Sequence, residues 1–352
     1  MSVRNGILDG WLGNGEDYLR NLRILRYAVG STLAMAFAMG FAWQLSFLTP
    51  VLALSFLATP APRPTLKAGI VFVTVIAVAC MAGLLLSRYL LPYPLVFIPF
   101  TGLLLLRLFY AKSGGASPLL ITWLMIAILL IPLMAMQSPA LAVGVAGGIV
   151  FGAAMTVLVV WLAYGIFPDP AGPQNEPVAP APAPAPTKTE RLRDSILSTV
   201  VVLPVLIMFY SFEFVGSLLV LIFIALLSMQ PSFAKNFEAG FALIIGNVVG
   251  GLAAIVFYNL LVVVPEFVFL IVLTLLAGLI FGSRVFSGKK TAPLYGMAFS
   301  TVLLVIGSTP SSTGDAGAKV YTRIVQIMLA VGYVVVAFGV IERIAKRREE
   351  AV

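Results

Sequence analysis

The stretch MQPSFAKNFEAGFALIIGNVVGG, Met229–Gly251, places a run of polar residues between two long apolar segments. An earlier stretch, LATPAPRPTLKAG at Leu57–Gly69, has the same character. In both stretches a proline and a cation precede an Ala-Gly pair, at 68–69 and 239–240, from which a long apolar run begins. Two matching boundaries of this kind predict that the chain uses one arrangement of membrane helices twice.

The composition of the whole chain is that of a membrane protein. Its 352 residues are 61% hydrophobic and 10% charged, and the mean hydropathy is +1.06. These values exceed what a soluble domain needs, so most of the protein surface must face lipid. The net charge of +8 then concerns orientation in the membrane, and we expect no nucleic-acid partner.

Twelve apolar runs of spanning or near-spanning length divide into two sets of six. Each run should be helical, because unpaired backbone groups are costly in lipid. We therefore expect an all-α polytopic membrane protein with about 12 transmembrane helices. The runs lie at 27–44, 47–59, 67–90, 94–111, 117–136, 140–166, 194–211, 214–229, 238–264, 266–283, 291–308 and 319–341.

Two of these runs, 47–59 and 214–229, are shorter than the roughly 20 residues of a straight span. The positions of Lys and Arg indicate whether the short runs cross, because cytoplasmic loops are enriched in these cations. With twelve crossings and a cytoplasmic N-terminus, 19 of the 22 cations face the cytoplasm. Without the two short crossings the division is 13 to 9. The charge pattern favours twelve crossings with both termini cytoplasmic, and leaves open whether the short helices are continuous.

A linker rich in proline and alanine separates the two halves. Residues 168–190 contain eight prolines in 23 positions, which favours an extended polyproline tether over a folded domain. Six crossings return the chain to the cytoplasm, so the two six-helix repeats, 27–167 and 191–341, should be parallel. A cytoplasmic amphipathic lead-in is expected at 1–26 and a charged cytoplasmic tail at 342–352.

The lead-in carries Arg20, Arg23 and Arg26 at helical spacing beside leucines. This pattern is typical of an interfacial helix that rests on anionic headgroups, so membrane lipids are expected partners. Ligand binding by these arginines is the alternative interpretation.

The polar turns after the two short helices are the predicted substrate region, because paired interrupted helices in two repeats mark transporter sites. These turns place cations at helix N-termini, where a bound anion would relieve the unfavourable dipole interaction. The alternative is that the cations only set topology. Asn247, between the glycines of a GxxxG pattern, needs a partner in hydrocarbon: another helix, a water-filled path or a substrate. The substrate candidates are Arg63, Lys67, Gln230, Ser232, Lys235, Asn247 and Arg323.

The opening stretch resembles the signature of the fusaric acid resistance (FUSC) and aromatic acid exporter superfamily, in which a Gln-Pro-Ser turn leads into a helix with a Gly-Thr-x-x-Gly core. The matching residues are Gln230, Pro231, Ser232, Gly246 and Gly250. Asn247 stands where threonine is usual, and Leu243 where arginine is frequent. With only a Pro-Ala linker and a short tail, the chain resembles a compact branch that lacks the large cytoplasmic domains.

The resemblance implies export of aromatic carboxylic acids and related small organic anions across a bacterial inner membrane, with a periplasmic adaptor of the membrane fusion type. An outer-membrane channel is a further candidate partner. We predict a proton-driven process, in which Glu213 and Glu238 are the candidate coupling carboxylates. The alternative for Glu238 is that it only matches the helix dipole from the first helical turn. The chain lacks histidine, and we expect no catalytic residues, metal or cofactor. A passive organic-anion channel and a non-transporting scaffold for the adaptor are the alternatives, and a homo-oligomer stays open.

Overall fold

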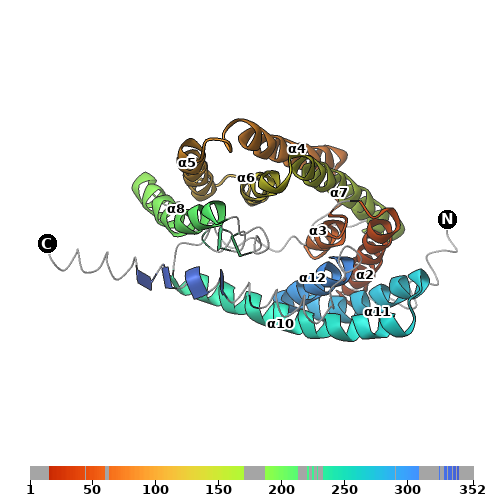
Figure 1. Cartoon of the computed structure of the whole chain (residues 1–352). Helices are drawn as coiled ribbons and strands as arrows, with labels where there is room; N and C mark the ends of the chain where they lie inside the picture. The colour runs from red at the N-terminus through yellow and green to blue at the C-terminus, as the bar shows by residue number, and fades with distance from the viewer. Residues whose placement is uncertain are drawn as a thin grey trace. The chain divides into compact units, whose positions relative to one another are not determined.

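The computed structural model describes residues 16–43, 45–59, 63–169, 187–212, 233–289 and 291–308, and helical pieces between 220 and 228 and between 325 and 340. Every regular element in these residues is an α-helix (Figure 1). Eight of the described helices are long and apolar enough to span a membrane, so this is an all-α, multi-pass membrane protein. The helices are α2 (Glu16–Phe41), α3 (Leu48–Leu57), α4 (Leu66–Tyr89), α5 (Pro94–Ser113), α6 (Pro118–Gln137), α7 (Pro139–Ile166), α8 (Lys188–Ser211), α10 (Phe233–Val263), α11 (Phe267–Val285) and α12 (Ala292–Ser308).

Prolines and a capping box set several helix starts. Helices α5, α6 and α7 begin at Pro94, Pro118 and Pro139, where the missing N–H has no cost. Helix α8 follows Thr187, whose hydroxyl accepts a hydrogen bond from the Glu190 N–H while the Glu190 carboxylate accepts one from the Thr187 N–H. The last three residues of the expected linker therefore belong to α8.

Helix α2 is continuous over 26 residues, a rise of about 39 Å. The described part of the expected interfacial lead-in, 16–26, is not a separate element, since Arg20, Arg23 and Arg26 lie in the first turns of this long helix. Arg20 is exposed and pairs with Asp17 at 3.1 Å. Arg26 is only 4% exposed, because it packs against the end of α7. The interpretation of Arg26 as a headgroup contact is therefore wrong.

The short second helix of the first half is continuous. Helix α3 has ten residues and rises about 15 Å, half of the ~30 Å hydrocarbon core. Its last residue, Leu57, reaches Gly30 of α2. The carbonyl of Pro64 then accepts a hydrogen bond of 3.0 Å from Trp161 Nε1 near the end of α7. Helix α3 alone is thus too short to span the membrane, and the chain beyond it continues toward the end of α7.

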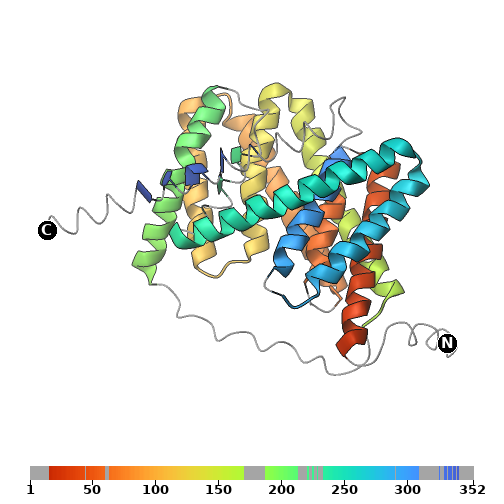
Figure 2. The ribbon, with the colours of Figure 1, turned by 90° about the horizontal axis from the view of Figure 1, so that it is seen from below.

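The chain packs into two compact units, each with its own hydrophobic core. Unit 1 consists of residues 1–71, 151–170 and 245–324, and unit 2 of residues 72–150, 171–244 and 325–352. The core of unit 1 surrounds the fully buried Tyr27, Met35 and Phe299. The core of unit 2 surrounds Phe97 and Leu105, which are also fully buried. Figure 2 shows α8, in green, beside α5, in orange, within this unit. Both cores draw side chains from both halves of the sequence.

Each unit combines helices of the two halves in the same pattern. In the order of the twelve expected segments, unit 1 contains the first, second and sixth segments of the first half, which are α2, α3 and the end of α7. It also contains the third to fifth segments of the second half, which are α10 to α12. Unit 2 takes α4 to α6 with α8 and the helical residues between 220 and 228 and between 325 and 340. As a result, α2 packs against α11 and α8 packs against α5.

Candidate functional site

Unit 2 contains a cavity of about 870 Å³ where the ends of α4, α6 and α8 meet the starts of α5 and α7. Its volume lies in the range of about 300–1,000 Å³ that is typical of small-molecule sites. The lining is mainly apolar and includes Leu84, Leu91, Phe97, Ile98, Met136 and Val143. The polar side chains of the lining are those of Ser87, Arg88, Tyr210 and Ser211.

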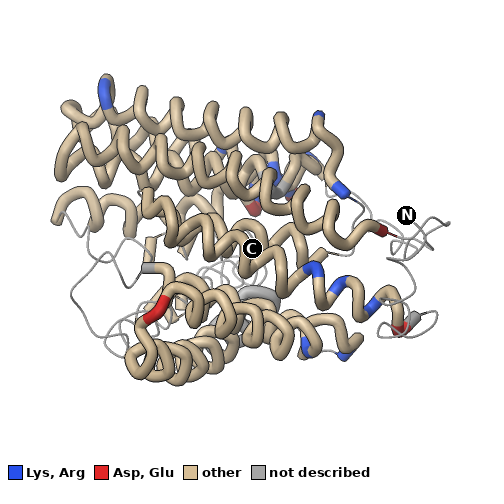
Figure 3. The backbone as a smooth tube through the Cα atoms, turned by 90° about the vertical axis from the view of Figure 1, so that its right-hand side faces the viewer, with Lys and Arg blue, Asp and Glu red and all other residues tan. Residues whose placement is uncertain are grey.

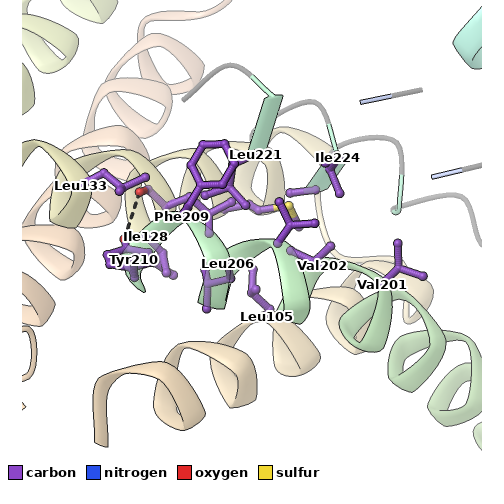
Figure 4. Close-up of a cluster of buried hydrophobic side chains, with 14 of the residues drawn as sticks. Leu105, Ile128, Leu133, Val201, Val202, Leu206, Phe209, Tyr210, Leu221 and Ile224 are labelled. Carbon is purple, nitrogen blue, oxygen red and sulfur yellow. Dashed lines mark hydrogen bonds between the residues drawn. The ribbon is translucent and has the colours of Figure 1, made fainter. Parts of the chain in front are cut away.

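Two aromatic residues form a fixed wall of this cavity. The rings of Phe97 and Tyr210 lie with their centroids 4.8 Å apart, and both residues are buried. The Tyr210 hydroxyl donates a hydrogen bond of 3.3 Å to the Leu129 carbonyl on α6. Figure 4 shows Tyr210 among the buried side chains of α5, α6 and α8. Packing on three helices holds the wall rigid, which suits it to contact the flat face of an aromatic ligand.

Arg88 supplies the positive charge of the lining. It lies in the last turn of α4, where a cation is favoured by the negative end of the helix dipole. Among the residues that the structure describes, no acceptor pairs with its guanidinium. The neighbouring Ser87 hydroxyl donates instead to the Gly83 carbonyl at 2.7 Å. The cavity therefore joins apolar walls to one charged donor group, the arrangement that an amphipathic anion requires.

Arg63 and Lys67, two of the predicted substrate residues, lie elsewhere, in unit 1. Both are exposed at the start of α4. The Arg63 guanidinium is 6.0 Å from the ring of Trp161, the outer limit of a cation–π contact. Trp161 is also the hydrogen-bond donor to Pro64, so this turn is fixed on α7 by the indole ring.

The second half of the chain matches a known family. Residues 205–337 match the family described as fusaric acid resistance protein-like. The second half of the chain is FUSC-like. The resemblance predicted from the Gln-Pro-Ser turn and the paired glycines is thereby confirmed. Residues 23–163 match a family described as protein of unknown function (DUF2955). No curated protein and no solved structure matches the chain.

In this FUSC-like half the paired glycines pack α10 against α12. A Cβ atom added to Gly246 would lie 2.8 Å from Met297 Cβ, and one added to Gly250 would meet the carbonyl oxygen of Ala298. Asn247 between them is 5% exposed, and its Oδ1 accepts a hydrogen bond of 2.9 Å from the Thr301 hydroxyl. Of the three partners expected for this amide, the structure supplies another helix.

The remaining predicted residues of the FUSC-like half cannot be placed in one site. Lys235 and Glu238 lie in the first two turns of α10, where the structure describes the backbone alone. The candidates that lie outside the described residues are Glu213, Gln230, Ser232 and Arg323. Glu213 follows the cavity residue Ser211 by two positions in the sequence.

Sequence reasoning missed Arg88 as a site residue. The signal for it was present, because Arg88 is the one cation of the first half that the favoured topology places on the non-cytoplasmic side. A lone arginine there is not needed for orientation, so it is a candidate for a functional role. The aromatic wall had no such signal, because Phe97 and Tyr210 belong to helices that are far apart in the sequence.

Proposed function

We propose that this protein exports small amphipathic organic anions, such as aromatic carboxylic acids, across the bacterial inner membrane. The observation that carries the proposal is the cavity of unit 2, where membrane-spanning helices line a half-open space with apolar walls and one guanidinium. The FUSC-like second half supports transport, and efflux in particular, as the general function. In this proposal the protein is a transporter, not an enzyme.

The charge distribution in each unit supports the proposed orientation, with both termini and the linker in the cytoplasm. In unit 2, Arg191 of α8 lies 4.4 Å from the ring of Tyr110 at the end of α5, beside Lys112. Arg88 lies at the opposite ends of these helices, around the cavity. In unit 1, Gly282 on α11 lies beside Tyr27 in the first half of α2. Arg284, two residues after Gly282, therefore lies toward the end of unit 1 at which α2 begins. Figure 3 shows that Lys and Arg of the described residues lie mostly toward helix ends.

Cysteine labelling tests this orientation. In a Cys80→Ala background, Ser113→Cys marks the cation-rich end of α5 and Ser211→Cys the cavity end of α8. A membrane-impermeant maleimide added to intact spheroplasts should label Ser211→Cys and should label Ser113→Cys only after the membrane is opened. The reverse pattern contradicts the proposed topology.

The exchanged helices support a parallel repeat of two six-helix sets, twelve crossings in all. Each unit combines the first, second and sixth segments of one half with the third to fifth segments of the other. The first helix of each half packs against the fourth helix of the other half. A pseudo-twofold relation between halves that enter the membrane in the same direction produces such a pattern. The two family matches, at 23–163 and 205–337, also fall one in each half.

Flux into liposomes tests the transport proposal. The purified protein is reconstituted, and uptake of benzenesulfonate is followed, because this anion stays charged at pH 7 and does not leak through lipid as a neutral acid. We expect accumulation against a concentration gradient when a proton gradient is imposed, and none in protein-free liposomes. Flux that runs only down the concentration gradient of the anion and does not change with the proton gradient identifies the passive channel. No flux above protein-free liposomes for any aromatic anion overturns the transport proposal and leaves the scaffold function.

Proton coupling and a periplasmic adaptor complete the proposal. Glu213→Gln and Glu238→Gln should each be tested in the same liposomes, because a coupling carboxylate must exchange protons during the cycle. Loss of uphill uptake with retained downhill exchange identifies the coupling residue. The adaptor, with an outer-membrane channel beyond it, should copurify with this protein after crosslinking in cells that coexpress a periplasmic adaptor of the membrane fusion type.

A further inference from the structure

The Ala-Gly pairs at the start of α4 and in α10 fix a register between the two sequence halves. Pro94 follows Gly69 by 25 residues, and Pro265 follows Gly240 by 25 residues. The two helix pairs α4–α5 and α10–α11 therefore correspond position by position across the turn that joins them. In this register Arg88 corresponds to Asn259, since each lies 19 residues after its glycine and six before its proline.

Local packing supports the correspondence in each unit. In unit 2, a Cβ atom on Gly83 of α4 would lie 2.7 Å from the Ala127 carbonyl of α6. In unit 1, Gly250 of α10 meets the Ala298 carbonyl of α12. The two carbonyls correspond, since each lies 33 residues after the proline of the register, whereas Gly250 lies four residues, about one helical turn, before the position that corresponds to Gly83. Helices α5 and α11 also end in similar turns, where Gly115 and Gly288 have φ values of 87° and 70°. The third and fifth helices of each half thus pack through a glycine on a carbonyl.

The charge at the corresponding positions differs. Arg88 lines the cavity of unit 2 and keeps its guanidinium donors without an acceptor among the described residues. The hydroxyl protons of Ser87 and Tyr210 are already donated to backbone carbonyls. Asn259 is exposed near the end of α10 and carries no charge. Of the two corresponding helix ends, only that of α4 can therefore bind an anion through the paired N–H donors of a guanidinium.

We propose that Arg88 anchors the carboxylate of the transported anion and that, among the residues that the structure describes, this anion site lies in unit 2 alone. This inference rests on the proposed function and assigns its binding residue. The guanidinium offers paired N–H donors that match a carboxylate, and the Phe97–Tyr210 wall receives the ring. The ligand class is an aromatic monocarboxylate: a second charge would meet the apolar lining of Leu84, Leu91 and Met136.

Binding measurements on the purified full-length protein test the assignment. Benzoate is the probe, and benzamide is its uncharged counterpart of similar shape. The Arg88→Gln variant should bind benzoate about 10- to 100-fold more weakly, because a charge-assisted pair is lost. It should bind benzamide as the wild type does, which also shows that the cavity is intact. The benzoate affinity of Arg88→Lys should lie between those of Arg88→Gln and the wild type, since lysine keeps the charge but not the planar pair of N–H donors.

Asn259→Gln is the matched control, at the corresponding position of the other half. It should leave benzoate affinity within about twofold of the wild type, a change of a few tenths of a kcal/mol. Equal benzoate affinity in Arg88→Gln and the wild type overturns the assignment, as does an equal loss in Asn259→Gln. Benzoate affinity of Arg88→Lys equal to that of the wild type also overturns the assignment, because lysine can fully replace an arginine that acts through its charge alone, as a lipid-headgroup anchor does. A wild type that neither binds nor transports any aromatic anion is a failure of the proposed function instead.

Discussion

Arg26 of α2 donates a hydrogen bond of 2.7 Å from Nη2 to a carboxylate oxygen of Asp169, three residues beyond the end of α7. The same guanidinium donates to the Phe167 carbonyl at 2.7 and 3.1 Å and lies 3.8 Å from the centre of the Tyr164 ring. These contacts satisfy a carbonyl at the helix C-terminus that has no partner within the helix. They also attach the start of the Pro-Ala linker to α2.

Removing the arginine from this cluster should destabilise unit 1. Arg26→Ala leaves the Asp169 carboxylate and the Phe167 carbonyl without their donor, at a cost of about 2–4 kcal/mol for a largely buried pair. Thermal unfolding in detergent should show a clear fall in midpoint. Arg20→Ala is the control, because its pair with Asp17 is half exposed or more on both sides and should contribute little. Equal midpoints for the two variants would mean that the buried cluster does not stabilise the fold.

A side chain at Gly250 should separate α10 from α12. In Gly250→Ala the new methyl group meets the Ala298 carbonyl and lies 2.7 Å from Thr301 Cβ, so the helices must move apart. We expect a loss of about 1–3 kcal/mol, the usual range for overpacking. Gly147→Ala on α7 is the matched control, because nothing lies within 4 Å of its added methyl group. There the better helix propensity of alanine should leave stability equal or up to about 1 kcal/mol higher. A tolerated Gly250→Ala would contradict close packing at this glycine.

The Asn247–Thr301 hydrogen bond allows packing to be separated from substrate binding. Replacing either residue, as in Asn247→Leu or Thr301→Val, removes the same contact between α10 and α12. A double-mutant cycle should give a coupling of about 0.6 kcal/mol and no more than about 1.7, as for other interhelical hydrogen bonds in membranes. If the amide serves packing alone, both variants should change liposome flux to the same small extent. A loss of flux confined to Asn247→Leu would assign the amide to the substrate path instead.

Local sequence patterns predicted the helices but not which helices meet. Run length and apolarity were sufficient for α4 to α7, α11 and α12, whose bounds lie within two residues of the expected runs, and prolines set three of the starts. The continuous α2 was missed because Arg20, Arg23 and Arg26 resemble an interfacial segment when their partners are unknown. Arg26 is buried by Phe167 and Asp169, which are 141 and 143 residues away. No periodicity within α2 contains that information.

The candidate cavity was beyond sequence reasoning for the same reason. It forms where five helix ends meet, and its aromatic wall joins Phe97 of the first half to Tyr210 of the second. The signature residues of the FUSC-like half identified the family, yet the described ones pack helices in unit 1. Part of a family signature in a membrane protein can thus mark the helix contacts that build the fold.

The exchange of helices between the halves predicts how the chain behaves when the linker is cut. In unit 1, Tyr27 of the first half lies with its ring centroid 5.7 Å from that of Phe299 of the second. In unit 2, the Phe97–Tyr210 pair also joins the two halves. Neither half can bury its core side chains alone, so 1–178 and 179–352 should each aggregate or be degraded when expressed separately.

Coexpression of these two pieces should restore both cores. We expect the pieces to copurify at equal amounts and to elute in detergent at the position of the intact protein. Full-length protein with a protease site between Val178 and Ala179 is the control, because it folds before it is cut and should then stay assembled and bind benzoate unchanged. If the cut halves separate into two monodisperse species, each half has a core of its own, and the interleaved units are excluded. The linker would then join two independent bundles, and the cavity wall could not contain both Phe97 and Tyr210.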